Sequence, residues 1–145
     1  MSISKKKRHL VYEKCRGHCA YCGREITLKQ MQVDHIAPQC FTEWESNPTV
    51  DGQPTTKDPD RMDNLLPSCY RCNHYKRSYS LEQYRGMVAT VHERIAKIYI
   101  VQVAMDYKIL TMDEMLWDGK FYFEKQQNQE QHEDFSEIPY QTKEG

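Results

Sequence analysis

Two kinds of hydrophobic spacing divide the chain into its expected elements. The stretch MQVDHI (31–36) alternates and carries β-branched Val33 and Ile36, which predicts a short strand. A second short strand is expected at NLLP (64–67). From 81 to 106, apolar residues recur every three or four positions, which predicts one long amphipathic helix. Ser80 and Gln83 have the spacing of a capping box at its start.

The ends of the chain carry weaker patterns. Residues 5–16 predict a short basic helix whose inner face holds Leu10, Val11 and Cys15. Near the other end, 117–125 predicts a hairpin that turns at Asp118-Gly119. A helical turn at 111–117, begun by Thr111 and Glu114, is the alternative there. The Gln- and Glu-rich tail that follows is expected to be disordered.

The middle of the chain contains a long polar loop, 37–63, with four prolines and Trp44 as an aromatic anchor. Loops of this length are usually functional or disordered. The elements together predict an α+β protein divided as follows: a basic N-terminal helix at 1–18, a core at 19–80, a C-terminal helix and hairpin at 81–125, and a tail at 126–145.

The charge is distributed unevenly, although the net charge of the 145 residues is only −1. Residues 1–85 carry 14 Lys and Arg against 10 Asp and Glu, and residues 86–145 carry 6 against 11. A basic front is compatible with a polyanionic partner, and an ordinary uneven surface is the alternative. No apolar run is long enough for a membrane span, and no apolar stretch follows the basic N-terminus. The protein is therefore expected to be cytoplasmic and not secreted.

Four of the six cysteines form two CxxC pairs, Cys19 with Cys22 and Cys69 with Cys72. Two such pairs predict a tetrahedral four-cysteine zinc site, while redox pairs and plain buried thiols are the alternatives. A zinc ion closed by four thiolates has no open position, so it is structural. Cys15 and Cys40 have no partner spacing and are expected to be ordinary thiols.

Any reaction must therefore use other residues, and the candidates lie beside the two pairs. Asp34 and His35 are adjacent within the first predicted strand. A buried strand gains little from a neighbouring carboxylate and imidazole, whereas a site that binds a metal and moves a proton uses both. The zinc is expected to bring the helix that begins near residue 72 back onto this strand.

The segments CAYC, VDHIAPQ and DNLLPSCYRCNHYK together resemble the HNH endonuclease family in its zinc-bearing form. The motif covers about 19–77, and FYFEK at 121–125 is more weakly similar to small HNH nucleases encoded by bacteriophages. The positions that match the family pattern are Cys19, Cys22, Asp34, His35, Asn64, Leu65, Cys69, Cys72 and Asn73.

The resemblance implies a ββα-metal fold, also called the His-Me finger, and a role for each residue. His35 would be the general base, and Asp34 and Asn73 would bind a catalytic Mg²⁺ or Mn²⁺ beside the scissile phosphate. Asn64 would hold the strand pair together so that His35 faces the phosphate. Many family members have histidine where this chain has Asn73, so the next residue, His74, is the alternative ligand.

The implied function is metal-dependent hydrolysis of double-stranded DNA, as a nick or a double-strand break. Arg71, Lys76 and Arg77 are expected to neutralise phosphate charge. The long C-terminal helix is expected to cover the core or to pair with a protein partner or a second copy. The alternative function is a non-catalytic zinc-ribbon module that binds DNA or protein, and a redox protein is a third class.

Overall fold

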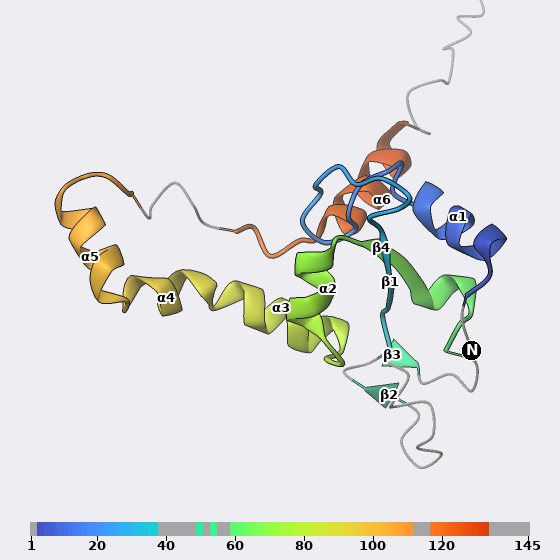
Figure 1. Ribbon diagram of the computed structural model, residues 1–145, viewed down its shortest axis with the longest axis horizontal. Coiled ribbons are helices and arrows are strands. Elements are labelled where there is room, and N and C mark those ends of the chain that lie inside the picture. Colours follow the sequence, from blue (N-terminus) through green and yellow to red (C-terminus); the bar gives the residue numbers. More distant parts are fainter. Residues whose placement is uncertain (1–2, 38–48, 51–52, 55–58, 112–116, 134–145) are drawn as a thin grey trace, which may run out of the picture.

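The structure is a computed structural model that describes residues 3–37, 49–50, 53–54, 59–111 and 117–133 (Figure 1). Its elements are α1 (Lys5–Glu13), β1 (Gln32–His35), β2 (Thr49–Val50), β3 (Gln53–Pro54), η2 (Met62–Asn64), β4 (Leu65–Ser68), α2 (Tyr70–Lys76), α3 (Leu81–Ala89), α4 (Val91–Ala96), α5 (Tyr99–Asp106) and α6 (Tyr122–Glu133). The predicted α+β class is confirmed.

The strand pair β1–β4 lies at the centre of the fold and is antiparallel, with Asp34 opposite Leu66 and His35 opposite Leu65. All four residues of β4 are buried, whereas in β1 only Asp34 is. Helix α2 follows β4 directly and packs against β1 (Figure 1). Both predicted strands therefore form, each within one residue of its expected limits. Strands β2 and β3 form a separate short antiparallel pair.

Helix α1 packs against β4 and is capped by Ser4, whose hydroxyl accepts a hydrogen bond from the Lys7 N–H. Its inner face is confirmed for Val11, which is buried, but not for Leu10, which is 51% exposed. The helix ends at Glu13 and not at residue 16 as predicted, so Cys15 is buried in the turn that follows it. Two basic residues of this helix and its C-cap form hydrogen bonds within the protein. Arg8 donates to the Leu28 and Met31 carbonyls, and Lys14 donates to the Met62 and Leu65 carbonyls.

The prediction of one long helix over 81–106 is wrong in one respect, because the segment forms three helices. The capping box of Ser80 and Gln83 begins α3 as predicted. The helix ends at Thr90, whose hydroxyl donates to the carbonyls of Gly86 and Met87 and so competes with the backbone. A second break precedes α5, where β-branched Ile98 has an extended backbone (ψ 125).

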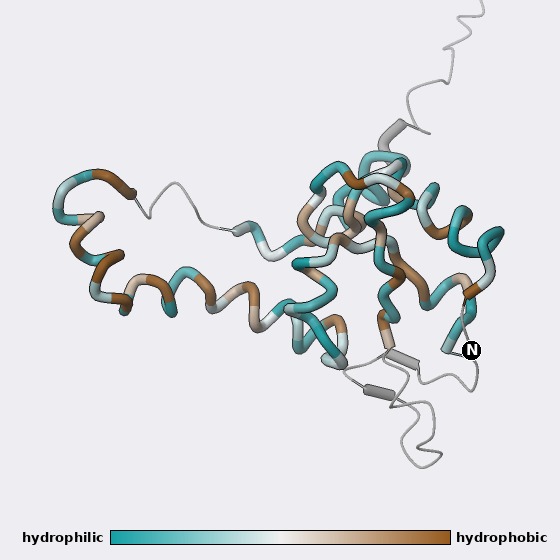
Figure 2. The backbone as a smooth tube through the Cα atoms, viewed as in Figure 1, coloured by the Kyte–Doolittle hydropathy of each residue, from teal (hydrophilic) through white to brown (hydrophobic). Residues whose placement is uncertain are grey.

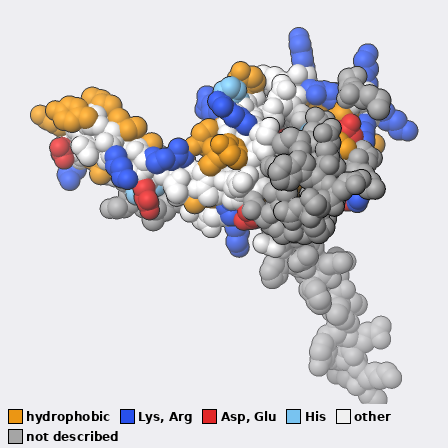
Figure 3. Space-filling model, turned by 90° about the horizontal axis from the view of Figure 1, so that it is seen from below, with side chains coloured by type: hydrophobic (Ala, Val, Ile, Leu, Met, Phe, Trp, Pro, Cys, Tyr) orange, Lys and Arg blue, Asp and Glu red, His pale blue; other side chains and the backbone are white. Residues whose placement is uncertain are grey.

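Helices α4 and α5 run away from the rest of the molecule and form an arm, residues 91–109 (Figure 1). Hydrophobic residues recur along it in Figure 2, and hydrophobic side chains gather at its far end in Figure 3. The exposed ones include Ile98, Tyr99, Ile100, Tyr107 and Ile109. The expected pairing of this segment with another chain stays a prediction. Among the helices of the described ranges, none has the length and apolar character needed to cross a bilayer.

The predicted hairpin at 117–125 is wrong, because the chain turns there and then forms α6. Asp118 and Gly119 do make a turn, with Gly119 at φ +81 and the Lys120 N–H donating to the Asp118 carboxylate. The residues that follow pair with another part of the chain. The N–H groups of Tyr122 and Phe123 donate to the carbonyls of Tyr21 and Ala20.

Helix α6 continues to Glu133, so the first part of the predicted disordered tail is helical. Gln and Glu are good helix formers, and the low apolar content that suggested disorder does not oppose a helix once its start is anchored. Phe121 supplies that anchor, since it is 2% exposed and stacks with Tyr84 in the core. Residues 134–145, Cys40 and Trp44 lie outside the described residues.

Candidate active site

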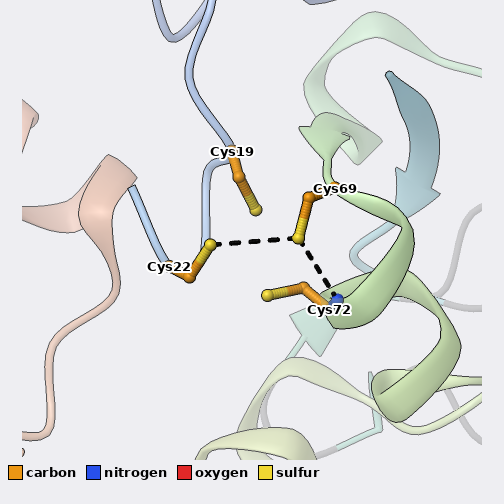
Figure 4. Close-up of side chains that lie close together, drawn as sticks. All are labelled: Cys19, Cys22, Cys69 and Cys72. Atoms are coloured by element: carbon orange, nitrogen blue, oxygen red, sulfur yellow. Dashed lines mark hydrogen bonds between the residues drawn. The ribbon is translucent and has the colours of Figure 1, made fainter. Parts of the chain in front are cut away.

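Four cysteine side chains from two distant parts of the chain converge at the start of α2 (Figure 4). Their Sγ atoms all lie within 4.8 Å of one another, and the Cys22 and Cys69 sulfurs are 3.9 Å apart. The backbone N–H of Cys72 donates to the Cys69 sulfur, which makes Cys69 the N-cap of α2. The predicted convergence of the two CxxC loops, 19–22 and 69–72, is therefore confirmed.

The donor set of this cluster fits a zinc ion. Four thiols that face a common centre match the tetrahedral sulfur coordination that Zn²⁺ prefers. Hydrogen bonds from the Cys22 and Cys72 thiols lower the pKa of Cys19. Cys15 lies outside the cluster, and burial raises its pKa to about 11, as expected for an ordinary thiol.

Strand β1 directs Asp34 into the interior, where its carboxylate has two partners. The Tyr21 hydroxyl donates to Oδ2. The Lys76 Nζ lies 3.2 Å from Oδ2 and 3.5 Å from Oδ1. Burial raises the pKa of Asp34 above its ordinary value, while the Lys76 ammonium and the Tyr21 hydroxyl act in the opposite direction.

His35, the next residue of β1, points to the other side of the strand and keeps 17% of its side chain exposed. Its Nε2 lies 2.8 Å from the Asp60 carboxylate. A carboxylate in this position fixes the orientation of an imidazole ring.

Asn64 is buried at the end of η2 and links three backbone groups. Its amide nitrogen donates to the carbonyls of Ala37 (3.1 Å) and Pro59 (2.8 Å), and its amide oxygen accepts from the Ala37 N–H (2.8 Å). The backbone of Ile36 also donates to the Asn64 carbonyl. The end of β1 is thereby tied to the start of β4 immediately after His35.

Replacing Asn64 by alanine is expected to lower the free energy of unfolding by about 2–3 kcal/mol, because the change leaves buried backbone groups at Ala37 and Pro59 unpaired. Chemical denaturation followed by intrinsic fluorescence measures this loss. Asp63→Ala is the matched control, since Asp63 is exposed and should change stability by less than about 0.5 kcal/mol. Equal effects of the two changes would contradict the linking role of Asn64.

Helix α2 presents the remaining candidates on different faces. Asn73 is half-buried and precedes Lys76 by three positions, so the two residues share one face of α2. His74 is exposed and stacks on the Tyr70 ring, with centroids 5.8 Å apart. Arg71 is exposed in the first turn of α2, and Arg77 is exposed at its C-cap, at the opposite end of the helix.

The expected phosphate contact of Lys76 does not fit this arrangement. Its side chain is fully buried, and its Nζ donates to the His35 carbonyl (2.9 Å) as well as pairing with Asp34. The ammonium therefore offsets the buried carboxylate and closes α2 onto β1, rather than facing the surface. The sequence pattern gave the charge of Lys76 but not the direction of its side chain.

Two further residues enter the site that sequence reasoning left out, Tyr21 and Asp60. Tyr21 lies inside the first CxxC loop, so its place near the site follows once that loop is docked beside β1. Asp60 comes from the long polar loop, where several similar carboxylates occur and no spacing distinguishes one of them.

Comparison with known proteins connects the chain to a segment of a nuclease. No family model matches. A stretch of 58 residues is 36% identical to the CRISPR-associated endonuclease Cas9 of Corynebacterium diphtheriae, and it covers 40% of this chain and 4% of that protein. Among solved structures, the Type II-C Cas9 enzyme from Actinomyces naeslundii is 27% identical, with a TM-score of 0.43, over 61% of this chain and 8% of that one. The chain thus spans a small fraction of the length of these relatives.

Proposed function

We propose that this chain is a metal-dependent DNA endonuclease of the HNH type, built on a ββα-metal core. The observation that carries the proposal is the placement of Asp34 and His35 side by side on β1, under a helix that four cysteines and Lys76 hold in place. The similarity to a segment of an endonuclease supports the same class. Docking of α2 on the strand pair in this way brings the first turns of the helix towards the Asp34 carboxylate of β1.

In the proposed reaction, His35 accepts a proton from the attacking water. The imidazole is partly exposed on β1, where a substrate can reach it, and general base catalysis typically contributes about 10²–10⁴ in rate. Asp60 orients the ring through Nε2. Asn64 fixes the backbone just beyond His35, and so keeps the imidazole at the surface of the strand pair.

The proposed catalytic ion would be held by Asp34 and Asn73. Their carboxylate and amide oxygens suit a hard ion such as Mg²⁺ or Mn²⁺. A divalent ion there would offset the negative charge that develops on the scissile phosphate and stabilise the leaving 3′-oxygen. The stacking of His74 on Tyr70 supports Asn73 over His74 as the second ligand, because the imidazole is directed to the exposed face.

Double-stranded DNA is the proposed substrate, and its contact surface is the exposed side of α2. Arg71 and Arg77 supply positive charge next to Asn73, and contacts of this kind position a duplex without reading its sequence. Arg8 and Lys14 are expected to contribute less to DNA binding than their charge suggests, because each side chain donates hydrogen bonds to backbone carbonyls within the protein.

A plasmid cleavage assay with a series of metal ions tests this function. Zinc-loaded protein is expected to convert supercoiled plasmid to nicked or linear forms with added Mg²⁺ or Mn²⁺, and to stop when a chelator removes the added ion. Zinc content should stay at about one ion per chain throughout. Binding of DNA without cleavage under any divalent ion would contradict the proposal and favour the non-catalytic zinc-ribbon module.

A further inference from the structure

The contacts around Tyr21 hold its side chain in one orientation. It lies between two cysteines of the cluster, and its ring is 4% exposed. The ring meets Tyr84 and Phe121 edge to face, with centroids 5.3 and 5.2 Å away. The backbone on either side is held as well, since the Ala20 N–H donates to the Pro67 carbonyl (2.8 Å) and the Tyr21 carbonyl accepts from the Tyr122 N–H (3.2 Å).

The hydroxyl at the end of this ring donates to Oδ2 of Asp34. Lys76 reaches the same oxygen more closely than Oδ1, at 3.2 against 3.5 Å. Both donors therefore favour Oδ2, and Oδ1 is the less engaged of the two oxygens.

We propose that Tyr21 is a positioning residue that fixes the Asp34 carboxylate for a divalent ion, and that the cysteine cluster acts on the catalytic ion through it. This inference rests on the function proposed above. A carboxylate with one oxygen held by a buried donor presents the other in a fixed direction, which reduces the reorganisation that ion binding requires. The first CxxC loop thus orients a ligand of the second metal while holding the first.

The direct test is the binding of Mn²⁺ to zinc-loaded protein without DNA, measured by titration calorimetry or by the loss of the free Mn²⁺ signal in electron paramagnetic resonance. Tyr21→Phe removes the hydroxyl and keeps the ring among Tyr84 and Phe121. It is expected to weaken Mn²⁺ binding by about tenfold to a hundredfold. In cleavage assays the half-saturating Mn²⁺ concentration should rise by the same factor, while the KM for DNA stays unchanged.

Tyr12→Phe is the matched control, because it removes another half-buried tyrosine hydroxyl, one that donates to the Ile26 carbonyl (2.9 Å). It should leave Mn²⁺ affinity unchanged. A double-mutant cycle with Asp34→Asn separates positioning from general loosening of the fold. If Tyr21 acts through Asp34, then adding Tyr21→Phe to Asp34→Asn should produce no further loss of affinity.

Three results would overturn the inference: unchanged Mn²⁺ affinity in Tyr21→Phe, an equal loss in Tyr12→Phe, or a full additional loss in the Asp34→Asn background. Failure of the nuclease function gives a different pattern, in which the unchanged protein binds Mn²⁺ and Tyr21→Phe weakens that binding, yet no variant cuts DNA. Unchanged protein that binds no Mn²⁺ would overturn both.

Discussion

Replacing His35 by alanine is expected to reduce DNA cleavage by about two to four orders of magnitude, because the proposed general base is lost. DNA binding and zinc content should stay close to those of the unchanged protein, since the imidazole is partly exposed and belongs to neither metal cluster. The measurement is single-turnover cleavage of a labelled duplex at saturating Mg²⁺. Single-turnover conditions report the chemical step without contributions from product release.

His9→Ala is the matched control, because His9 is an exposed histidine on α1 whose nearest carboxylate, Glu13, is 3.9 Å away. It should cleave at the unchanged rate. Asp60→Asn tests the orientation of the base and should fall between the two, because it weakens the contact with Nε2 but keeps the ring. If His35→Ala cleaves normally, the assignment of the general base is wrong. If Asp60→Asn increases the rate, Asp60 restrains the base instead of orienting it.

Replacing Cys69 by serine is expected to leave the protein largely unfolded. Structural zinc contributes about 10–16 kcal/mol in zinc-finger peptides, whereas a whole domain is stable by only about 5–15 kcal/mol. Cys69 also caps α2, and serine is itself a favoured N-cap residue, so this change keeps a cap on the helix while removing a zinc ligand. The loss of the fold is therefore expected to accompany the loss of zinc. Circular dichroism during thermal unfolding, combined with a colorimetric zinc assay, measures both effects.

Cys15→Ala is the control for losing a buried thiol, because Cys15 is 2% exposed and stands outside the cluster. It should fold, keep its zinc and unfold at a somewhat lower temperature. A strong zinc chelator should reproduce the Cys69→Ser result in unchanged protein. A folded, zinc-free Cys69→Ser protein would show that the cluster does not hold the fold together.

The parts of the fold that the sequence predicts well are those set by local pattern. Alternation around Val33 predicts β1, the CxxC spacing predicts the cluster, and the pair Ser80 and Gln83 predicts the start of α3. For each strand or helix start the determining residues lie within a few positions of one another, and for the cluster this holds within each CxxC pair. The hairpin at 117–125 fails because the N–H groups after Gly119 pair with the distant first CxxC loop, which no local pattern reveals.

The same distinction explains which site residues were missed. Lys76 is predicted to be a surface cation because its charge is a property of the residue type. Its burial depends instead on the docking of α2 against β1. Asp60 joins His35 across the long loop, and Tyr21 reaches Asp34 through the core. These contacts form only in the tertiary structure. The sequence identifies His35 and Asp34 as candidate site residues, but not their partners Asp60 and Tyr21.

The pairing register of β1 with β4 has an evolutionary consequence. Neighbouring residues on a strand face opposite sides, so Asp34 is enclosed by Tyr21 and Lys76 while His35 remains accessible from outside. A single-residue insertion or deletion within this strand would exchange their surroundings, burying the imidazole and exposing the carboxylate. The residues around this dipeptide can therefore change during evolution. The register of the strand cannot shift by one residue without exchanging the surroundings of Asp34 and His35.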